Sequence, residues 1–269
     1  MTGRYEHTVP YRVRFDECTP RGVLRTSTLL RYAQDVAWVH SENLGFDHRW
    51  YAERGLTWLV RGVDLVVGRD GAMGETLAVT TRVVGTRRVW ARRRADVAGE
   101  DGRAVATILT DWVLIDAAGV PVRLPPEFEG RFAGEVERFL PTRVALPRGP
   151  ATVAGQPFPV RAWDLDALDH VNNARYLDFV DEALAGARPE LVERRPVRYR
   201  MEYIRGAGPG LELRSLAWPD GPGLAYRLES GDGEELLRAV VGPPDELDEP
   251  GGPDTPNAPD ANLRPARTG

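Results

Sequence analysis

The stretch at residues 164–186 reads "DLDALDHVNNARYLDFVDEALAG" and joins a polar loop to an amphipathic segment. It follows a short strand-like stretch, "PFPVR" at 157–161. From Asn173 onward apolar residues recur at helical spacing, namely Leu177, Val180, Ala183 and Leu184. The pattern predicts a strand, a turn, and a helix that begins near Asn173 and stops near Gly186.

The same order occurs earlier in the chain. "PYRVR" at 10–14 resembles "PFPVR", and "RTSTLLRYAQDVA" from Arg25 lies over "NNARYLDFVDEAL" from Asn172 without a gap. In this register Tyr32 corresponds to Phe179. An ungapped register of nearly thirty residues indicates a duplicated unit. Gly45 is the expected stop of the first helix.

Each unit continues with strand-like segments that alternate apolar and polar residues and are separated by turn signals. They are residues 56–67, 75–97 and 103–116 in the first unit, and 197–204, 211–218, 224–230 and 235–242 in the second. One long helix followed by antiparallel strands, made twice, predicts an α+β protein.

The division of the chain follows from composition. We expect a first domain at 1–139, a linker rich in Pro and small residues at 140–155, and a second domain at 156–242. Residues 243–269 are rich in Pro, Gly and Asp and are predicted to be disordered. From Gly242 onward six acidic residues stand against two arginines, so the preceding residues carry only about −1 of the total charge of −5. This near neutrality favours neither nucleic acid nor a membrane surface as partner.

Cysteine content and the lengths of the apolar runs bear on the compartment and on membrane association. The single cysteine, Cys18, excludes an internal disulfide framework and fits a reducing compartment. The N-terminal residues show no apolar signal segment, and no apolar run approaches about 18 residues. We therefore expect a cytoplasmic protein that does not span a membrane.

The motif D-x-D-x-x-x-H-V-N-N-x-x-Y at Asp164–Tyr176 resembles the active-site segment of hotdog-fold thioesterases. Two such units, together with "RVWARRRADVAGEDGRAVATILTDWVLIDAAGVPVRLPPEF" at 88–128, resemble the fatty acyl-ACP thioesterases of plants and their bacterial relatives. The resemblance covers roughly residues 8–242. It implies a tandem (double) hotdog, in which two long helices are each wrapped by a curled antiparallel β-sheet and the halves form a pseudo-dimer. It also implies that the first half, which is degenerate, binds the acyl chain and the second is catalytic.

Two positions depart from the family pattern. The plant enzymes read D-x-N-x-H, where this chain has Leu168 in place of Asn. Their strand L-E-Y-x-R-E-C-G is here "MEYIRGAG", so Gly206 and Ala207 replace the catalytic Glu and the neighbouring Cys. The wider hotdog scheme, in which one carboxylate and a helix N-terminus suffice, reconciles the chain with catalysis.

Thioester hydrolysis needs a nucleophile at the carbonyl carbon and stabilisation of the oxyanion. The amides of a helix beginning near Asn173 have no intrahelical partner and carry partial positive charge. Asp166 could attack directly or activate water. The candidate catalytic residues are Asp166, His170, Asn172 and Asn173. One asparagine is expected to cap the helix.

Other polar residues have simpler interpretations. Asp164 is expected to be structural, and Cys18 a small buried residue; Glu202 is a weaker candidate to replace the lost Glu. His7, His40 and His48 lack metal-ligand spacing and are interpreted as incidental. The run at 87–94 is either a solvated sheet face or a docking surface for an acidic carrier protein. The aromatic residues expected in the core are Trp163, Tyr176 and Phe179.

The sequence thus predicts a thioesterase that hydrolyses a fatty acyl thioester, with acyl-ACP favoured and no metal or redox cofactor. An acyl-CoA thioesterase and a catalytically silent acyl-binding protein are the alternatives. We expect a monomer or homodimer.

Overall fold

The computed structural model describes residues 5–132, 136–149 and 157–244. The chain divides into two compact units, Met1–Thr142 and Arg143–Gly269, so the division falls within the stretch predicted as a linker. Residues 150–155 of that linker, and the predicted tail from residue 245 onward, lie outside the described residues.

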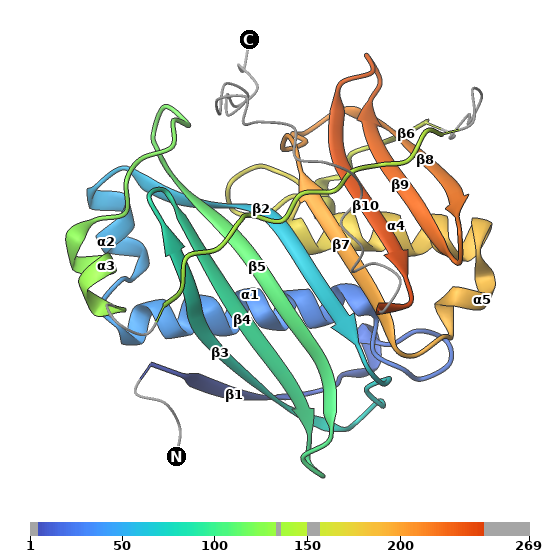
Figure 1. Cartoon of the computed structure of the whole chain (residues 1–269), viewed down its shortest axis with the longest axis horizontal. Coiled ribbons are helices and arrows are strands. Elements are labelled where there is room, and N and C mark those ends of the chain that lie inside the picture. Colours follow the sequence, from blue (N-terminus) through green and yellow to red (C-terminus); the bar gives the residue numbers. More distant parts are fainter. Residues whose placement is uncertain (1–4, 133–135, 150–156, 245–269) are drawn as a thin grey trace. The chain divides into compact units, whose positions relative to one another are not determined.

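The first unit contains one long helix and one antiparallel sheet (Figure 1). Helix α1 (Thr26–Asn43) lies across one face of the sheet, whose strand order is β1-β3-β4-β5-β2. The strands are β1 (His7–Arg12), β2 (Leu56–Val67), β3 (Thr76–Arg87), β4 (Trp90–Gly99) and β5 (Ala104–Asp116). Buried and half-buried residues alternate along β3 and β4, because one face of each strand packs toward the core.

The second unit repeats this arrangement. Helix α4 (Asn173–Ala187) lies against a sheet of order β7-β10-β9-β8-β6 (Figure 1). The strands are β6 (Pro157–Pro159), β7 (Val197–Tyr203), β8 (Glu212–Asp220), β9 (Gly223–Ser230) and β10 (Glu235–Gly242). Two units of one long helix and an antiparallel sheet confirm the predicted α+β class.

Short helices complete the fold and were not foreseen. They are α2 (His48–Glu53), α3 (Pro126–Arg131), α5 (Pro189–Val192) and two 3-10 turns, Phe15–Glu17 and Ala162–Asp164. The predicted stop at Gly45 is confirmed, since it follows α1 with φ +89. The predicted end near Gly186 is confirmed to within one residue, since α4 ends at Ala187, and Arg188 leaves the helical conformation before Pro189.

The predicted repeat register is confirmed by main-chain hydrogen bonds. The Thr19 amide donates to the Val23 carbonyl at 2.8 Å, and the Asp166 amide donates to the His170 carbonyl at 2.8 Å. Isolated bridges Cys18–Leu24 and Leu165–Val171 follow the same 147-residue spacing. Both units therefore enter their long helix through the same backbone frame.

None of the helices in the described ranges is long and apolar enough to cross a membrane.

Candidate active site

The loop between β6 and α4 folds back on itself before the helix begins. The Asp166 amide donates to the His170 carbonyl, and the Asp169 amide donates to the Asp166 carbonyl at 3.0 Å. Asp169 adopts the left-handed conformation, with φ +58, which an aspartate tolerates better than most residues. The turn places Asp166 and His170 at the two ends of a five-residue span.

The Asp166 side chain is half-buried and has one engaged oxygen. Its Oδ1 accepts a hydrogen bond from the Leu168 amide at 2.9 Å. Its Oδ2 has no hydrogen-bond partner among the residues that the structure describes. The carboxylate is therefore oriented through one oxygen, and the other is available to a substrate or a water.

His170 is exposed, and Leu168, which also bonds Asp166, holds its side chain. Its Nδ1 lies 2.9 Å from the Leu168 carbonyl oxygen. Because a carbonyl can only accept, Nδ1 carries the hydrogen, and the neutral imidazole has its lone pair on Nε2. Leu168 orients both functional groups through its backbone, while its side chain is 51% exposed. The family's Asn at this position is thus not needed to hold Asp166 and His170.

The two asparagines have different positions at the helix N-terminus. Asn172 is the N-cap, as expected of one of them, and its Oδ1 accepts from the Ala174 amide at 3.0 Å. Within residues 5–132, 136–149 and 157–244, neither the Asn173 backbone amide nor its side chain has a hydrogen-bond partner. The first amide of α4 is therefore free to bind an oxyanion.

Asp164 has a structural role, as predicted. It is buried, its Oδ1 accepts from Arg175 Nε at 2.7 Å, and its Oδ2 accepts from the Arg161 amide at 2.8 Å. Its carbonyl accepts from the Asn172 amide at 2.8 Å. These bonds tie the loop to the first turn of α4.

A pair of buried tyrosines supports the helix start, and Tyr203 was not foreseen as part of the site. The Tyr176 hydroxyl accepts from the Ala207 amide at 2.9 Å, and the Tyr203 hydroxyl donates to the Asn173 carbonyl at 2.9 Å. Burial, and to a lesser extent the charge of Asp166, raise the pKa of Tyr176 to about 12, so it stays a neutral phenol. Periodicity alone marks such residues as core, which is why their contacts escape sequence reasoning.

Gly206, at the position of the family's Glu, faces His170. A Cβ added at Gly206 would lie 3.2 Å from His170 Cδ2, so the imidazole occupies the space beside this glycine. Glu202 does not replace the missing carboxylate. It is buried and accepts from Arg143 Nη1 at 2.7 Å and from the Val144 amide at 2.9 Å, so the interpretation as a substitute is wrong.

The equivalent loop in the first unit lacks the polar set. Thr19 stands in place of Asp166, Val23 in place of His170, and Arg25 in place of Asn172. The Thr19 hydroxyl is buried and has no hydrogen-bond partner among the described residues. This loop offers neither a carboxylate nor an imidazole at the corresponding positions.

The arginine run alternates between the two faces of β4 at its centre. Arg92 Nε pairs with the buried Asp111 at 2.6 Å, Arg94 Nη2 pairs with Asp96 at 2.8 Å, and Arg93 is buried. Arg92 and Arg94 are thus already paired within the sheet. The solvated face is wrong for Arg93, because strand alternation turns it inward, whereas Arg94, whose side chain is 38% exposed, fits that face. The docking surface for an acidic carrier protein stays a prediction.

Further expectations are settled by burial. Tyr176 and Phe179 are in the core as predicted, and Cys18 is a small buried residue. Trp163 is 81% exposed, so its assignment to the core is wrong, because it lies on a 3-10 turn that faces solvent. His40 is buried and bonded to Arg93, so it is not incidental. In the described ranges no cluster of three or more His, Cys, Asp or Glu is placed to hold a metal ion.

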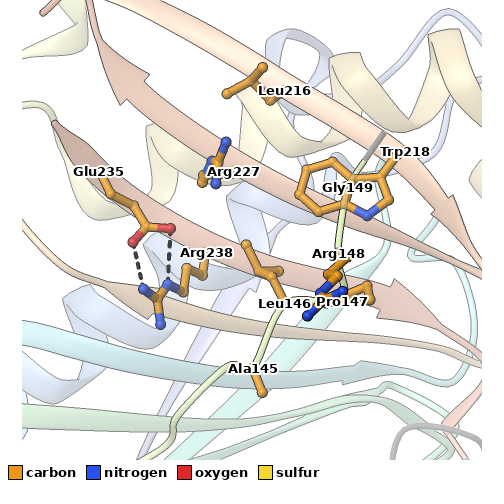
Figure 2. A pocket seen from close by; sticks show the side chains of 10 residues that line it. All are labelled: Ala145, Leu146, Pro147, Arg148, Gly149, Leu216, Trp218, Arg227, Glu235 and Arg238. Carbon is orange, nitrogen blue, oxygen red and sulfur yellow. Dashed lines mark hydrogen bonds and ion pairs between the residues drawn. The ribbon is translucent and has the colours of Figure 1, made fainter. Parts of the chain in front are cut away.

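A cavity of about 610 Å³ lies elsewhere in the second unit (Figure 2). Residues 145–149 cross the sheet there, and β8, β9 and β10 contribute Leu216, Trp218, Arg227, Glu235 and Arg238. None of the candidate catalytic residues lines it. The candidate site therefore rests on the chemistry of the loop and not on this cavity.

Comparison with protein families gives a consistent result. The family model of the acyl-ACP thioesterase N-terminal domain matches residues 4–129, and that of the C-terminal domain matches residues 150–235. The chloroplastic acyl-acyl-carrier-protein hydrolase FATB2 of Cuphea viscosissima is 26% identical over 242 residues, covering 78% of this chain and 56% of that protein. The chloroplastic palmitoyl-acyl carrier protein thioesterase of Cuphea hookeriana is 25% identical, covering 78% and 55%. The chain thus spans about half the length of these relatives.

Solved structures share the fold. An acyl-ACP thioesterase from Bacteroides thetaiotaomicron is 18% identical with a TM-score of 0.76, over 88% of this chain and 97% of that one. A 12:0-ACP thioesterase from Umbellularia californica is 22% identical with a TM-score of 0.72, over 88% and 96%. At these identities the likeness shows the fold, which is the double hotdog that the sequence predicted.

Proposed function

Because the chain belongs to the acyl-ACP thioesterase family, we propose that it hydrolyses a fatty acyl thioester, with acyl-ACP as the substrate. One observation carries the proposal. The second unit places the free Oδ2 of Asp166, the lone pair of His170 and the unbonded Asn173 amide on one loop–helix junction. The matching junction of the first unit keeps the backbone frame but lacks these groups.

The proposed chemistry begins at Asp166. Its Oδ2 either attacks the thioester carbonyl carbon or takes a proton from the water that attacks it. The carbonyl oxygen then gains negative charge, and the free amide at the start of α4 can stabilise it. Collapse of this intermediate expels the carrier thiolate, which is a good leaving group because a thiol has a pKa of about 8.5. If water attacked, the product is the free acid. If Asp166 attacked, the product is an acyl–Asp166 anhydride, which a water molecule then hydrolyses to the free acid and the regenerated carboxylate.

His170 supplies a second proton acceptor. With Nδ1 bonded to the Leu168 carbonyl, Nε2 can accept a proton from water or deliver one to the departing thiolate. Asn172 contributes by capping α4, which keeps the Ala174 amide occupied and the helix start ordered. Asn173 contributes its backbone amide and offers an unengaged side chain to the substrate.

The finer assignments belong to the same proposal. The first domain, residues 1–139, would bind the acyl chain and the second, residues 156–242, would perform the chemistry. A cytoplasmic location and a monomeric or homodimeric state remain predictions from the sequence.

The test is a panel of acyl-ACP and acyl-CoA substrates of several chain lengths, read out as free acid released by the full chain. We expect release from acyl-ACP with the higher kcat/KM. A higher kcat/KM on acyl-CoA would favour the CoA thioesterase instead. Binding of acyl chains without any release of acid would favour the silent binding protein.

A further inference from the structure

The cavity of the second unit lies between residues 145–149, called the strap below, and one face of strands β8, β9 and β10 (Figure 2). The segment just before the strap is fixed by Glu202 on β7, which accepts from Arg143 Nη1 at 2.7 Å and from the next backbone amide at 2.9 Å. At the other end Gly149 lies against the Trp218 ring, because a Cβ added there would meet ring atoms at 3.4 Å. The strap therefore has a defined position over the sheet.

Two arginines face each other across the floor of the cavity. Arg227 on β9 and Arg238 on β10 are register partners in the antiparallel ladder, and both line the cavity. Side chains of directly opposed residues project from the same face of a sheet, with their Cβ atoms about 5 Å apart. Like charges in this arrangement are destabilising, so an anion bound between them would offset their repulsion.

The neighbouring carboxylates leave part of this positive charge unpaired. Glu235 pairs with Nε and Nη2 of Arg238, at 2.9 and 2.6 Å. Glu229 meets only Nε of Arg227, at 2.8 Å and outside hydrogen-bond geometry. Among the described residues, Nη1 and Nη2 of Arg227 have no partner. Glu202, the register partner of Arg238 on β7, is already engaged by the segment before the strap.

A third guanidinium group comes from the strap. Arg148 lines the cavity, its side chain is exposed, and no partner for it occurs in the part of the chain that the structure describes (Figure 2). The lining residues thus include three arginines and one carboxylate, that of Glu235. Because arginine only donates hydrogen bonds, the cavity offers donors and positive charge to a ligand that accepts and is negative.

An apolar cluster borders the cations. Leu216, Trp218 and Ala225 are buried together, and Leu146 of the strap packs against them. Leu216 is also the register partner of Arg227, so a ligand held by that guanidinium group would meet apolar side chains on the next strand. At about 610 Å³ the cavity has the size of a small-molecule site and is larger than a single phosphate needs.

We propose that this cavity binds an organic diphosphate, such as a nucleoside diphosphate. The phosphates contact Arg148, Arg227 and Arg238, and the organic part packs against the apolar cluster. A guanidinium group matches two phosphate oxygens at a time, and a diphosphate carries enough charge for three cations, whereas a single carboxylate does not. None of the candidate catalytic residues lines the cavity, and the test reads binding, so this proposal and that of thioester hydrolysis can fail separately.

The experiment titrates ADP, adenosine and pyrophosphate into the full chain at low ionic strength, without divalent cations, and follows the heat by calorimetry. We expect ADP to bind at least about tenfold more tightly than adenosine, which lacks the phosphates. ADP should also bind more tightly than pyrophosphate, which lacks the organic part. Added salt should weaken the binding of ADP, because it screens the partly exposed arginines.

Three variants test the assignment of the residues. Arg227→Met should weaken ADP binding by at least about tenfold. Arg205→Met is the matched control, because Arg205 is also 40% exposed and paired with one glutamate but does not line the cavity, and it should leave ADP binding unchanged. Glu235→Gln removes the lining carboxylate beside Arg238 and should tighten ADP binding by about threefold.

Equal affinities for ADP and adenosine would overturn the proposal, as would an ADP affinity that Arg227→Met leaves unchanged. Pyrophosphate binding as tightly as ADP would also overturn it, because the apolar cluster would then have no role. If Arg227→Met does not fold, Glu235→Gln decides, since a misfolded chain does not gain affinity. An unchanged or weaker ADP affinity in Glu235→Gln contradicts the proposal.

Discussion

The loops at 14–26 and 161–173 have the same backbone frame and different side chains. In each, a 3-10 turn is followed by an isolated bridge and a left-handed residue, and an acidic side chain bonds back to the preceding arginine amide. Only the second loop presents a carboxylate and an imidazole at the turn. The backbone frame therefore forms without the polar side chains on which the proposed chemistry depends.

The largest difference between the loops should be catalytic. Asp166→Asn keeps the size and most hydrogen bonds of the side chain, but it removes the charge that attacks or takes a proton. We expect kcat to fall about 10²–10⁴-fold, or roughly 3–5 kcal/mol, with the melting temperature unchanged. Release of free acid from acyl-ACP measures the effect.

Thr19→Ala is the control in the first loop and should leave kcat within about twofold. The kcat of His170→Ala should lie between the kcat values of Asp166→Asn and Thr19→Ala. If folded Asp166→Asn keeps more than about a tenth of the native kcat, the chemistry is at another site.

The acidic residues that brace the two loops should differ in their contribution to stability. Asp164 is buried and pairs with Arg175, whereas Glu17 pairs with Arg14, whose side chain is 66% exposed, and accepts from the Tyr32 hydroxyl at 2.5 Å. We expect Asp164→Ala to lower the free energy of unfolding by about 2–3 kcal/mol and Glu17→Ala by about 1 kcal/mol. Chemical denaturation measures both, and the reverse order would contradict the comparison.

A third difference concerns pH, because the residue equivalent to His40 in the second unit is Ala187. The pKa of folded His40 is about 3, so below about pH 6.5 the unfolded chain binds a proton that the folded chain does not. Stability is therefore lost as the pH falls from about 6.5 toward 3, by up to about 1.4 kcal/mol per pH unit.

The measurement is the free energy of unfolding of the native chain and of His40→Asn between pH 7 and pH 5. Asparagine can still accept the Arg93 hydrogen bond but cannot titrate. The variant should show a flatter pH dependence, and parallel curves would argue against the neutral His40.

The glycine beside His170 allows a finer test of the second loop. A Cβ at Gly206 would lie 3.2 Å from the imidazole, whereas a Cβ at Gly208 meets nothing within 4 Å. We expect Gly206→Ala to lower kcat by about 2–10-fold by displacing His170, and Gly208→Ala to have no such effect. Equal losses in both variants would mean that His170 position does not limit the rate.

The smallest effect should come from the left-handed residue of each turn, which is Gly22 in the first loop and Asp169 in the second. Glycine adopts this conformation without steric cost. Asp169→Gly should raise the free energy of unfolding by about 0.5 kcal/mol, and Gly22→Ala should lower it by about 1 kcal/mol. Thermal melting checks both, and changes of the same sign would show that the turns are not equivalent.

The sequence by itself determined the order of the long elements, the repeat and the position of the loop. Apolar periodicity and turn residues are local properties, so the long helix of each unit and nearly all strands could be located from them. The polar set at Asp166, His170, Asn172 and Asn173 was visible because its members lie within eight residues of one another.

Only the tertiary structure decided what distant partners do. The burial of Arg93 depends on His40 and Ser41, which are about fifty residues away, and Glu202 is engaged by residues that precede it by nearly sixty. Trp163 is exposed, although a large aromatic side chain was expected in the core. Only the path of the loop in the folded chain shows that this side chain faces solvent. Periodicity reports which residues share a face, but the ionic partner of a side chain is set by packing between elements far apart in the chain.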